Sequence, residues 1–189
     1  MRLFAAVDLS RETRDAMAAE QQRIKASLGP AAAHLKWVRP DKAHLTLVFL
    51  GEVHTDDVPR LVAAMSQDVD EPAFDISFSG RGVFPARGAP RVLWIGISAG
   101  IDHLRSLQRE VARRIATHGL ALETRDFHPH LTVARWAASR PSDGGRALGH
   151  KQAEIIACEK VARVTLFESR LSSSGASYTA LAHANLTRR

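Results

Sequence analysis

Two short segments of the sequence combine a histidine and a threonine at the same spacing. Residues 44–46 and residues 130–132 both read "HLT". Side chains on a β-strand alternate between its two faces, so the histidine and threonine of each segment would share one face while the leucine points to the other. Each segment therefore predicts an imidazole and a hydroxyl side by side, backed by aliphatic packing.

If the two segments face each other, the pair of imidazoles suits acid–base chemistry. The unperturbed histidine pKa near 6.5 lets one ring be neutral and the other protonated near neutral pH. The neutral ring can take a proton from an attacking water or hydroxyl, and the protonated ring can deliver one to a leaving oxygen; each transfer is typically worth about 10²–10⁴ in rate. The hydroxyls of Thr46 and Thr132 can donate to non-bridging phosphoryl oxygens. The natural substrate is a phosphodiester, and no metal is required.

Arg135 follows the second segment and could add a planar, permanently charged fork to the same phosphate. Because Arg135 is three residues from Thr132, an uninterrupted strand would aim it at the opposite face. It would reach the phosphate only if the strand bends or ends there. His128 precedes Pro129, and proline is confined to strand starts or edges, so we expect His128 just outside the strand.

The remaining histidines and the single cysteine do not indicate a metal or cofactor site. The nine histidines show neither the HExxH pattern nor a Cys/His zinc spacing. Cys158 alone permits no internal disulfide, and we expect it to be a small buried hydrophobe. Surface or structural roles are expected for the histidines without a matched partner: His34, His54, His103, His118, His150 and His183.

The composition is that of a globular protein. Its 189 residues suit one domain, or two small lobes sharing a core, with 45% hydrophobic and 24% charged residues. The apolar runs are far shorter than the roughly 18–20 residues that span a bilayer, so we expect a cytoplasmic protein. A formal net charge of +6 favours anionic partners without identifying them.

Periodicity and end signals predict the elements. Ser10 is the expected N-cap of a first helix that Gly29 and Pro30 end, and Gly119 is the expected C-cap of a second. A Gly/Ser/Pro-rich segment, residues 139–149, is expected to be an exposed, mobile loop. The expected strands are 3–8, 44–50, 73–84, 90–98 and 130–134, with two more closing the chain, and the expected helices are 11–28, 56–68 and 101–118.

The order strand, helix, HLT strand occurs twice. The interval from the first strand to the HLT histidine is 41 residues in one half (Leu3 to His44) and 38 in the other (Val92 to His130). This predicts two similar lobes related by an approximate two-fold axis, in an α+β fold with the helices outside the sheets.

These residues resemble the 2H phosphoesterase superfamily, which is defined by two H-x-[ST] motifs, and more narrowly the RNA 2',3'-cyclic phosphodiesterases, historically called 2'-5' RNA ligases. The resemblance runs over nearly the whole chain. It is carried by "RLFAAVDL", "WVRPDKAHLTLVFLGEV", "PRVLWIGI", "FHPHLTVAR" and "LFESRLSSSGASY". It implies one domain over residues 1–189 made of two similar intertwined lobes, with a cleft between two antiparallel sheets, and a monomer.

The resemblance also implies roles. His44 and His130 would be catalytic, Thr46 and Thr132 would donate to the phosphate, and Arg135 would be a further phosphate ligand. The reaction implied is hydrolysis of an RNA 2',3'-cyclic phosphate to a 2'-phosphate, without a cofactor. His130 would accept the proton of water and His44 would protonate the departing O3'; in the reverse reaction, 2'-5' ligation, these roles are exchanged.

Two alternatives remain open at the level of sequence. The chain could be a non-catalytic RNA-binding module that keeps a phosphate-binding cleft, or a 2H phosphodiesterase acting on another small cyclic phosphate or nucleotide. Phe127 and Trp37 are candidates for stacking on a base, although packing in the core is the expected role of each.

Overall fold

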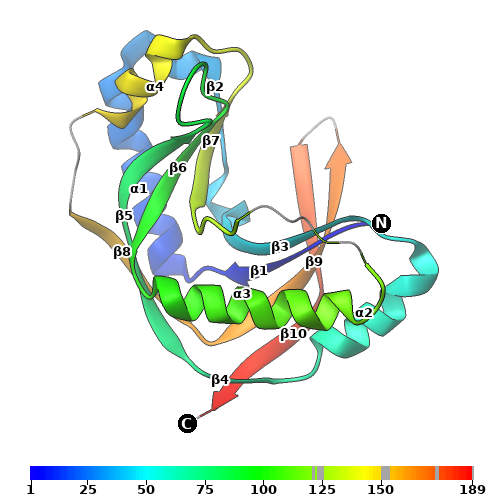
Figure 1. Cartoon of the computed structure of the whole chain (residues 1–189). Helices are drawn as coiled ribbons and strands as arrows, with labels where there is room; N and C mark the ends of the chain where they lie inside the picture. The colour runs from blue at the N-terminus through cyan, green and yellow to red at the C-terminus, as the bar shows by residue number, and fades with distance from the viewer. Residues whose placement is uncertain (121, 123–125, 150–153, 173–174, 189) are drawn as a thin grey trace.

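The computed structural model describes residues 1–120, 122, 126–149, 154–172 and 175–188. Within these residues the chain forms ten strands and four α-helices. The strands lie in two curved five-stranded sheets, with the orders β3-β1-β9-β10-β4 and β2-β7-β6-β5-β8 (Figure 1). The expected α+β class is confirmed.

The first sheet is antiparallel except at one edge, where β4 runs parallel to β10. Its strands are β1 (Arg2–Asp8), β3 (His44–Glu52), β4 (Val69–Pro72), β9 (Arg163–Ser172) and β10 (Gly175–Arg188). The second sheet is antiparallel throughout. Its strands are β2 (Leu35–Trp37), β5 (Phe74–Phe84), β6 (Val92–Ala99), β7 (Leu131–Trp136) and β8 (Ile155–Val161).

Local signals fix the ends of the helices, which are α1 (Arg11–Leu28), α2 (Val58–Met65), α3 (Ile101–Ala116) and α4 (Pro141–Leu148). The Ser10 hydroxyl accepts a hydrogen bond from the backbone N–H of Thr13, which confirms the predicted N-cap of α1. The expected C-cap of α3 is wrong, because Thr117 occupies that position. Gly119 instead adopts φ +80° in the turn beyond the helix.

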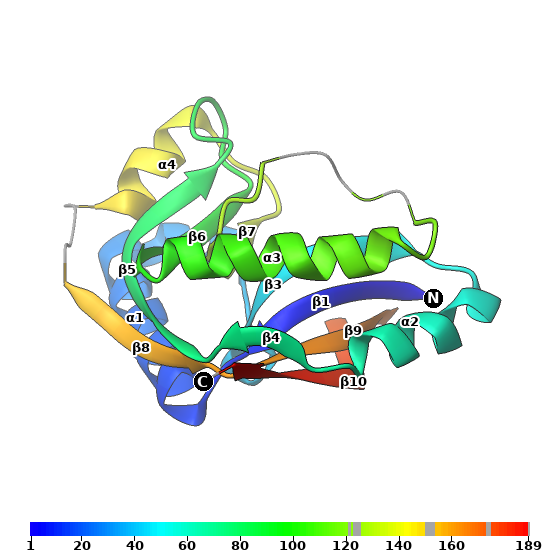
Figure 2. The same cartoon turned by 60° about the horizontal axis from the view of Figure 1, so that its bottom comes forward.

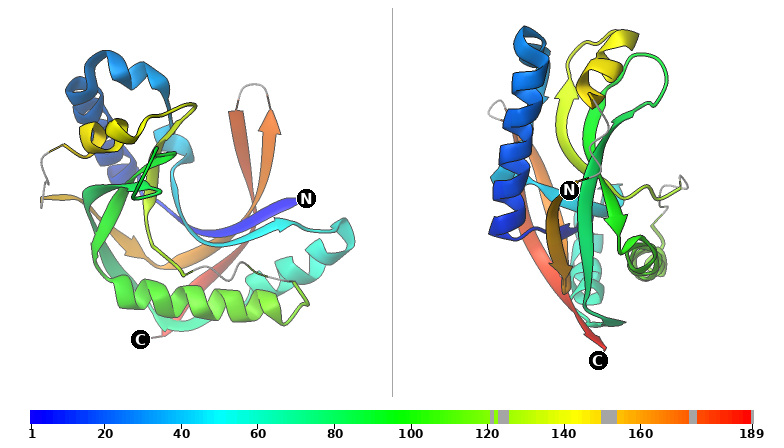
Figure 3. Two further views of the ribbon diagram at one scale, coloured as in Figure 1. Left: turned by 45° about the horizontal axis from the view of Figure 1, so that its top comes forward. Right: turned by 90° about the vertical axis from the view of Figure 1, so that its left-hand side faces the viewer.

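The helices cover the outer faces of the two sheets (Figure 3). α2 contacts β9 and β10, whereas α4 contacts β5. The two long helices are exchanged: α1 follows β1 of the first sheet but contacts β8 of the second, and α3 follows β6 of the second sheet but contacts β3 of the first (Figure 2). The Gln21 side-chain amide on α1 donates to the carbonyls of Val38 and Val133, at 2.8 and 2.9 Å, and so ties α1 to the second sheet.

The same four-strand order occurs in both sheets. β3-β1-β9-β10 in the first sheet corresponds to β7-β6-β5-β8 in the second, and each HLT strand is outermost in its set of four. This order agrees with the approximate two-fold relation of the lobes. The division of residues 1–189 into one domain of two intertwined lobes stays an interpretation.

Residues 139–149 are not the expected loop, because they contain α4. Pro141 stands at the first helical position, and the Asp143 carboxylate accepts a hydrogen bond from the backbone N–H of Arg140 at 2.7 Å. Gly144 is buried where α4 packs on β5, and a methyl group placed there would lie 3.6 Å from Val83, an ordinary van der Waals contact. Gly144 and Gly145, which suggested a loop, therefore lie inside a helix, and Gly149 is its C-cap.

Other expectations were incomplete. The strands β2, β4 and β8 were not predicted, and Cys158 is exposed rather than buried. Cys158 lies on β8, the edge strand of the second sheet, where its sulfur is 3.6 Å from the Ser77 hydroxyl. None of the described helices is both long and apolar enough to cross a lipid bilayer.

Candidate active site

The two HLT segments stand at the beginnings of β3 and β7. His44 opens β3, and His130 immediately precedes β7. In both segments the histidine and threonine are half-buried and the leucine between them is buried, at 0% exposure for Leu45 and 1% for Leu131. The predicted alternation is therefore present in each strand.

A bulge follows each threonine at the same position. On β3 the pairing with β1 skips from Thr46 to Val48, and on β7 the pairing with β6 skips from Thr132 to Ala134. A bulge adds one residue to one strand and shifts its alternation of side chains. The two residues after each threonine are accordingly both buried: Leu47 and Val48 on β3, and Val133 and Ala134 on β7.

The bulge on β7 explains how Arg135 can lie on the same face of the strand as Thr132. Without it, Arg135 would point to the face opposite Thr132; with it, Arg135 is exposed on the same face as Thr132. The equivalent residue on β3 is Phe49, which returns to the face of Thr46 and is 51% exposed. We call this side of both sheets the histidine face.

A backbone carbonyl two residues earlier holds each imidazole. His44 Nδ1 lies 2.9 Å from the carbonyl oxygen of Lys42, and His130 Nδ1 lies 2.8 Å from that of His128. A carbonyl oxygen can only accept, so Nδ1 of each ring carries a proton and donates it. Nε2 is therefore the nitrogen of each ring that can accept or donate a proton in a reaction.

Aromatic rings enclose His44. Its ring centroid lies 4.6 Å from that of Phe4 and 4.9 Å from that of Tyr178, which meets it edge-on. Phe4 is in turn directly opposite both Phe49 and Phe167 in the ladders of the first sheet. The three phenylalanines form a row across β3, β1 and β9 beside His44.

His130 has a matching enclosure in the second sheet. Phe84 meets its ring edge-on at 5.0 Å, and the Trp94 ring is 6.1 Å away. Trp94 also lies 5.2 Å from the ring of His128 and directly across Gly82 of β5. A Cβ at Gly82 would be 2.0 Å from the indole, so only glycine leaves room for Trp94 in this position.

Burial lowers the pKa of both histidines below the ordinary value, and the charge of Arg135 lowers both further. The hydrogen bond to the Lys42 carbonyl and the carboxylate of Asp8 oppose this shift at His44. At His130 the bond to the His128 carbonyl opposes it, whereas His128 itself lowers the pKa.

Electrostatics and contacts connect the two lobes at this place. β3 and β7 contact each other, and Arg135 of β7 is close enough to His44 of β3 to influence its pKa. The two imidazoles, the two threonine-bearing strands and Arg135 thus belong to one region of the molecule. His128 is exposed and lies outside β7, as expected.

The other histidines have local partners or lie elsewhere. His103 stacks on Phe74, His54 lies 3.4 Å from the Asp56 carboxylate, and His183 shares a hydrogen bond with Thr165. His150 lies outside the described residues. Within the described ranges, no group of three or more His, Cys, Asp or Glu side chains is arranged to hold a metal ion.

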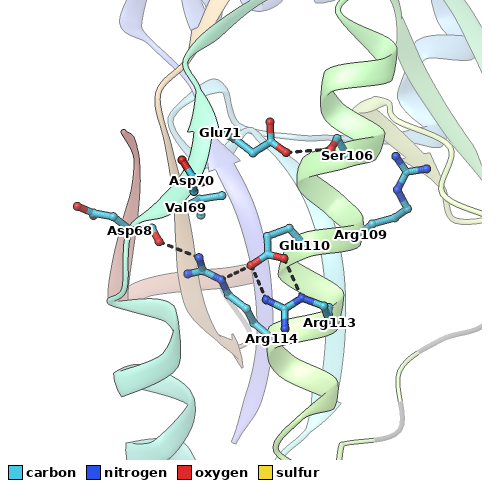
Figure 4. A pocket seen from close by; sticks show the side chains of 9 residues that line it. All are labelled: Asp68, Val69, Asp70, Glu71, Ser106, Arg109, Glu110, Arg113 and Arg114. Atoms are coloured by element: carbon cyan, nitrogen blue, oxygen red, sulfur yellow. Dashed lines mark hydrogen bonds and ion pairs between the residues drawn. The ribbon is translucent and has the colours of Figure 1, made fainter. Parts of the chain in front are cut away.

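A pocket of about 510 Å³ lies between β4 and α3, and none of these residues lines it (Figure 4). Several side chains of the lining form hydrogen bonds with other residues of the lining. Glu110 accepts hydrogen bonds from Arg113 and Arg114, Arg114 also donates to the carbonyl of Asp68, and Ser106 donates to Glu71. These bonds join α3 to the segment before β4 and to β4 itself.

Phe49 and Tyr178 were not singled out in the sequence, although Phe49 had a detectable signal. Aligning "HLTLVF" with "HLTVAR" places Phe49 against Arg135, but the shared face becomes evident only with the bulges. Tyr178 reaches His44 from β10, far along the chain. Trp37 and Phe127, the expected stacking candidates, are partly buried against the core, and the Trp37 indole donates to the Ala32 carbonyl.

Fold and site define a class of protein. The family model of the 2'-5' RNA ligase superfamily matches residues 13–168. The chain belongs to this superfamily, which confirms the resemblance found in the sequence.

Particular relatives extend the match to most of the chain. The RNA 2',3'-cyclic phosphodiesterase of Methanothermobacter thermautotrophicus is 34% identical over 182 residues, which cover 95% of each chain. That of Archaeoglobus fulgidus is 36% identical over 141 residues, or 75% of this chain and 76% of the relative. Among solved structures, the protein TT0787 of Thermus thermophilus has a TM-score of 0.78 at 27% identity, with all of both chains covered. Escherichia coli LigT complexed with 3'-AMP has a TM-score of 0.76 at 27% identity, covering 99% of this chain and 98% of LigT.

Proposed function

We propose that this protein hydrolyses RNA 2',3'-cyclic phosphate ends to 2'-phosphates by acid–base catalysis between His44 and His130, without a metal ion. The observation that carries the proposal is the repeated arrangement in β3 and β7. Each strand places an imidazole, held through its Nδ1, beside a threonine, and a cation that influences both imidazoles lies on the same face. The names of the relatives support the choice of substrate.

In this scheme Nε2 of neutral His130 takes a proton from water as its oxygen attacks phosphorus. The bond from phosphorus to O3' breaks, and protonated His44 gives its Nε2 proton to O3'. The product keeps its phosphate on O2'. His130 ends protonated and His44 neutral, so exchange of protons with solvent restores the starting state.

The remaining groups of the site bind the phosphate. The Thr46 and Thr132 hydroxyls donate to the non-bridging oxygens, and Arg135 supplies a permanent positive charge. A low histidine pKa suits the base, because His130 is then neutral in the free enzyme. For the acid, the negative charge of bound phosphate offsets Arg135 and raises the pKa of His44, so that His44 is protonated when substrate is in place.

An exposed phenyl ring is available to the nucleoside. Phe49 is on the histidine face and is supported from beneath by Phe4, at 6.3 Å between ring centroids. Bases that are free of a duplex commonly stack on aromatic side chains. Phe49 therefore replaces Trp37 and Phe127 as the stacking candidate.

Product analysis with chelator present tests the reaction. We expect a nucleoside 2',3'-cyclic monophosphate, and a short RNA with the same end, to be converted to 2'-phosphates. Salt-sensitive binding of RNA with no turnover, indifferent to the cyclic end, would instead establish the non-catalytic module. Turnover restricted to some other cyclic phosphate would establish a different 2H phosphodiesterase.

A further inference from the structure

Lys36 lies beside the proposed phosphate site, on the edge strand β2. In the ladder between β2 and β7 it is directly opposite Arg135, so the two side chains leave the sheet on the same side. The neighbouring pair, Leu35 and Trp136, points the other way and lines a recess on the helix side with residues of α1 and α4. Lys36 is therefore exposed on the histidine face.

Two like charges directly opposite each other destabilise an antiparallel pair. Within the part of the chain that the structure describes, the side chains of Lys36 and Arg135 have no hydrogen bond or ion pair. Elsewhere in the same sheet a lysine is opposite a residue of the other charge: Lys160 on β8 faces Asp75 on β5.

The next two cationic side chains after β2, those of Arg39 and Lys42, both have hydrogen-bond partners. The Arg39 guanidinium binds the Asp41 carboxylate through Nε and Nη2, at 3.0 and 2.8 Å. Lys42 donates to the carbonyl of Ala176. Lys36 and Arg135 are thus a repulsive pair that an anion on the histidine face would relieve.

We propose that Lys36 binds the phosphodiester on the 5' side of the terminal nucleotide, and so makes the site selective for RNA ends over cyclic mononucleotides. This inference rests on the proposed function. With Arg135 at the cyclic phosphate, Lys36 is one strand farther out, at a spacing of about 4.8 Å, and its flexible stem extends its reach. An RNA strand carries one negative charge per nucleotide, so the next anion is the upstream phosphate, which a mononucleotide lacks.

The test compares three substrates with one terminal nucleoside. They are the nucleoside 2',3'-cyclic monophosphate, a dinucleotide ending in the same group, and that dinucleotide with an uncharged methylphosphonate as its internal linkage. We expect Lys36→Gln to lower the ratio of kcat/KM for the charged dinucleotide to that for the mononucleotide about three- to tenfold, as for one charged contact. The dependence of log(kcat/KM) on log[salt] for the dinucleotide should become shallower by about 0.7.

Lys160→Gln is the matched control, since it removes the same charge from an exposed position on the same sheet, and it should leave this ratio unchanged. The methylphosphonate should remove the difference in ratio between Lys36→Gln and the unmodified protein. The inference is overturned if Lys36→Gln leaves the ratio unchanged, or if it lowers the ratio equally with the uncharged linkage. Failure of the unmodified protein to turn over any of the three substrates would overturn the proposed function itself, and this inference with it.

Discussion

At the scale of the residue, the proposed site rests on two histidines that are held by the same kind of hydrogen bond but have different surroundings. Both donate from Nδ1 to the carbonyl two residues earlier, so both present Nε2 for reaction. They differ in the charges around them: Asp8 influences His44, and His128 influences His130. This asymmetry supports His44 as the proton donor and His130 as the acceptor.

Replacing Asp8 tests this difference. Asp8 is opposite His44 in the β1–β3 ladder, and its negative charge raises the pKa of His44. We expect Asp8→Asn to lower the His44 pKa in an NMR titration of the imidazole. The protonated fraction of His44 at pH 7 then falls, and kcat/KM at pH 7 should fall by the same factor. The His130 pKa should not move. An unchanged His44 pKa, or an equal change at His130 or in the exposed control Asp15→Asn, would contradict the account.

At the scale of the element, the bulges in β3 and β7 decide which residues share the histidine face. Each bulge buries two consecutive residues and returns the next to the side of the threonine. The adjoining strands complete the face through close contacts. In the second sheet the contact of Trp94 with Gly82 fixes the indole beside His128 and His130.

We expect Gly82→Ala to displace Trp94, because the added methyl group would overlap the indole ring. The free energy of unfolding should fall by about 1–3 kcal/mol, as for overpacking in other cores, and kcat/KM should fall with it. Gly145→Ala is the control, since nothing lies within 4 Å of a Cβ on this helical glycine. That variant should be more stable by about 0.4–1 kcal/mol. Denaturant unfolding that shows the same effect for both would contradict this packing.

The sequence predicted what depends on neighbours along the chain. Ser10 and Gly29 sufficed for α1, and the spacing in "HLT" sufficed for the shared face of histidine and threonine. The face of Arg135 could not be predicted, because the bulge arises from pairing between β6 and β7. α4 was missed because its two glycines are poor helix formers, and the contact that the helix makes with β5 is not visible in the sequence.

At the scale of the whole molecule, the exchange of α1 and α3 between the sheets holds the two HLT strands in one region. Buried polar groups make the connection at α1. Glu20 is fully buried and accepts a hydrogen bond from Arg81 of β5 at 2.8 Å, while Arg23 approaches its other oxygen at 3.2 Å. Gln21 bridges two backbone carbonyls of the second lobe.

We expect Glu20→Ala to lower the free energy of unfolding by about 3–5 kcal/mol, because Arg81 would be left buried without its partner. Asp15→Ala, which removes an exposed ion pair with Arg11 on the same helix, should lower it by about 0.5 kcal/mol or less. Urea unfolding of the two variants measures the difference. Equal losses would show that the Glu20 contact does not fasten α1 to the second sheet.

The most direct test of the acid–base pair compares His44→Ala and His130→Ala on two cyclic phosphates. One is the ordinary nucleoside 2',3'-cyclic phosphate, and the other carries sulfur in place of the 3' bridging oxygen, so that a thiolate leaves without needing a proton. We predict that both variants lose about 10²–10⁴ in kcat/KM on the oxygen substrate. The sulfur substrate should restore most of the activity of His44→Ala and none of that of His130→Ala. Restoration in His130→Ala instead would reverse the roles, and full activity of either variant on the oxygen substrate would contradict the two-histidine mechanism.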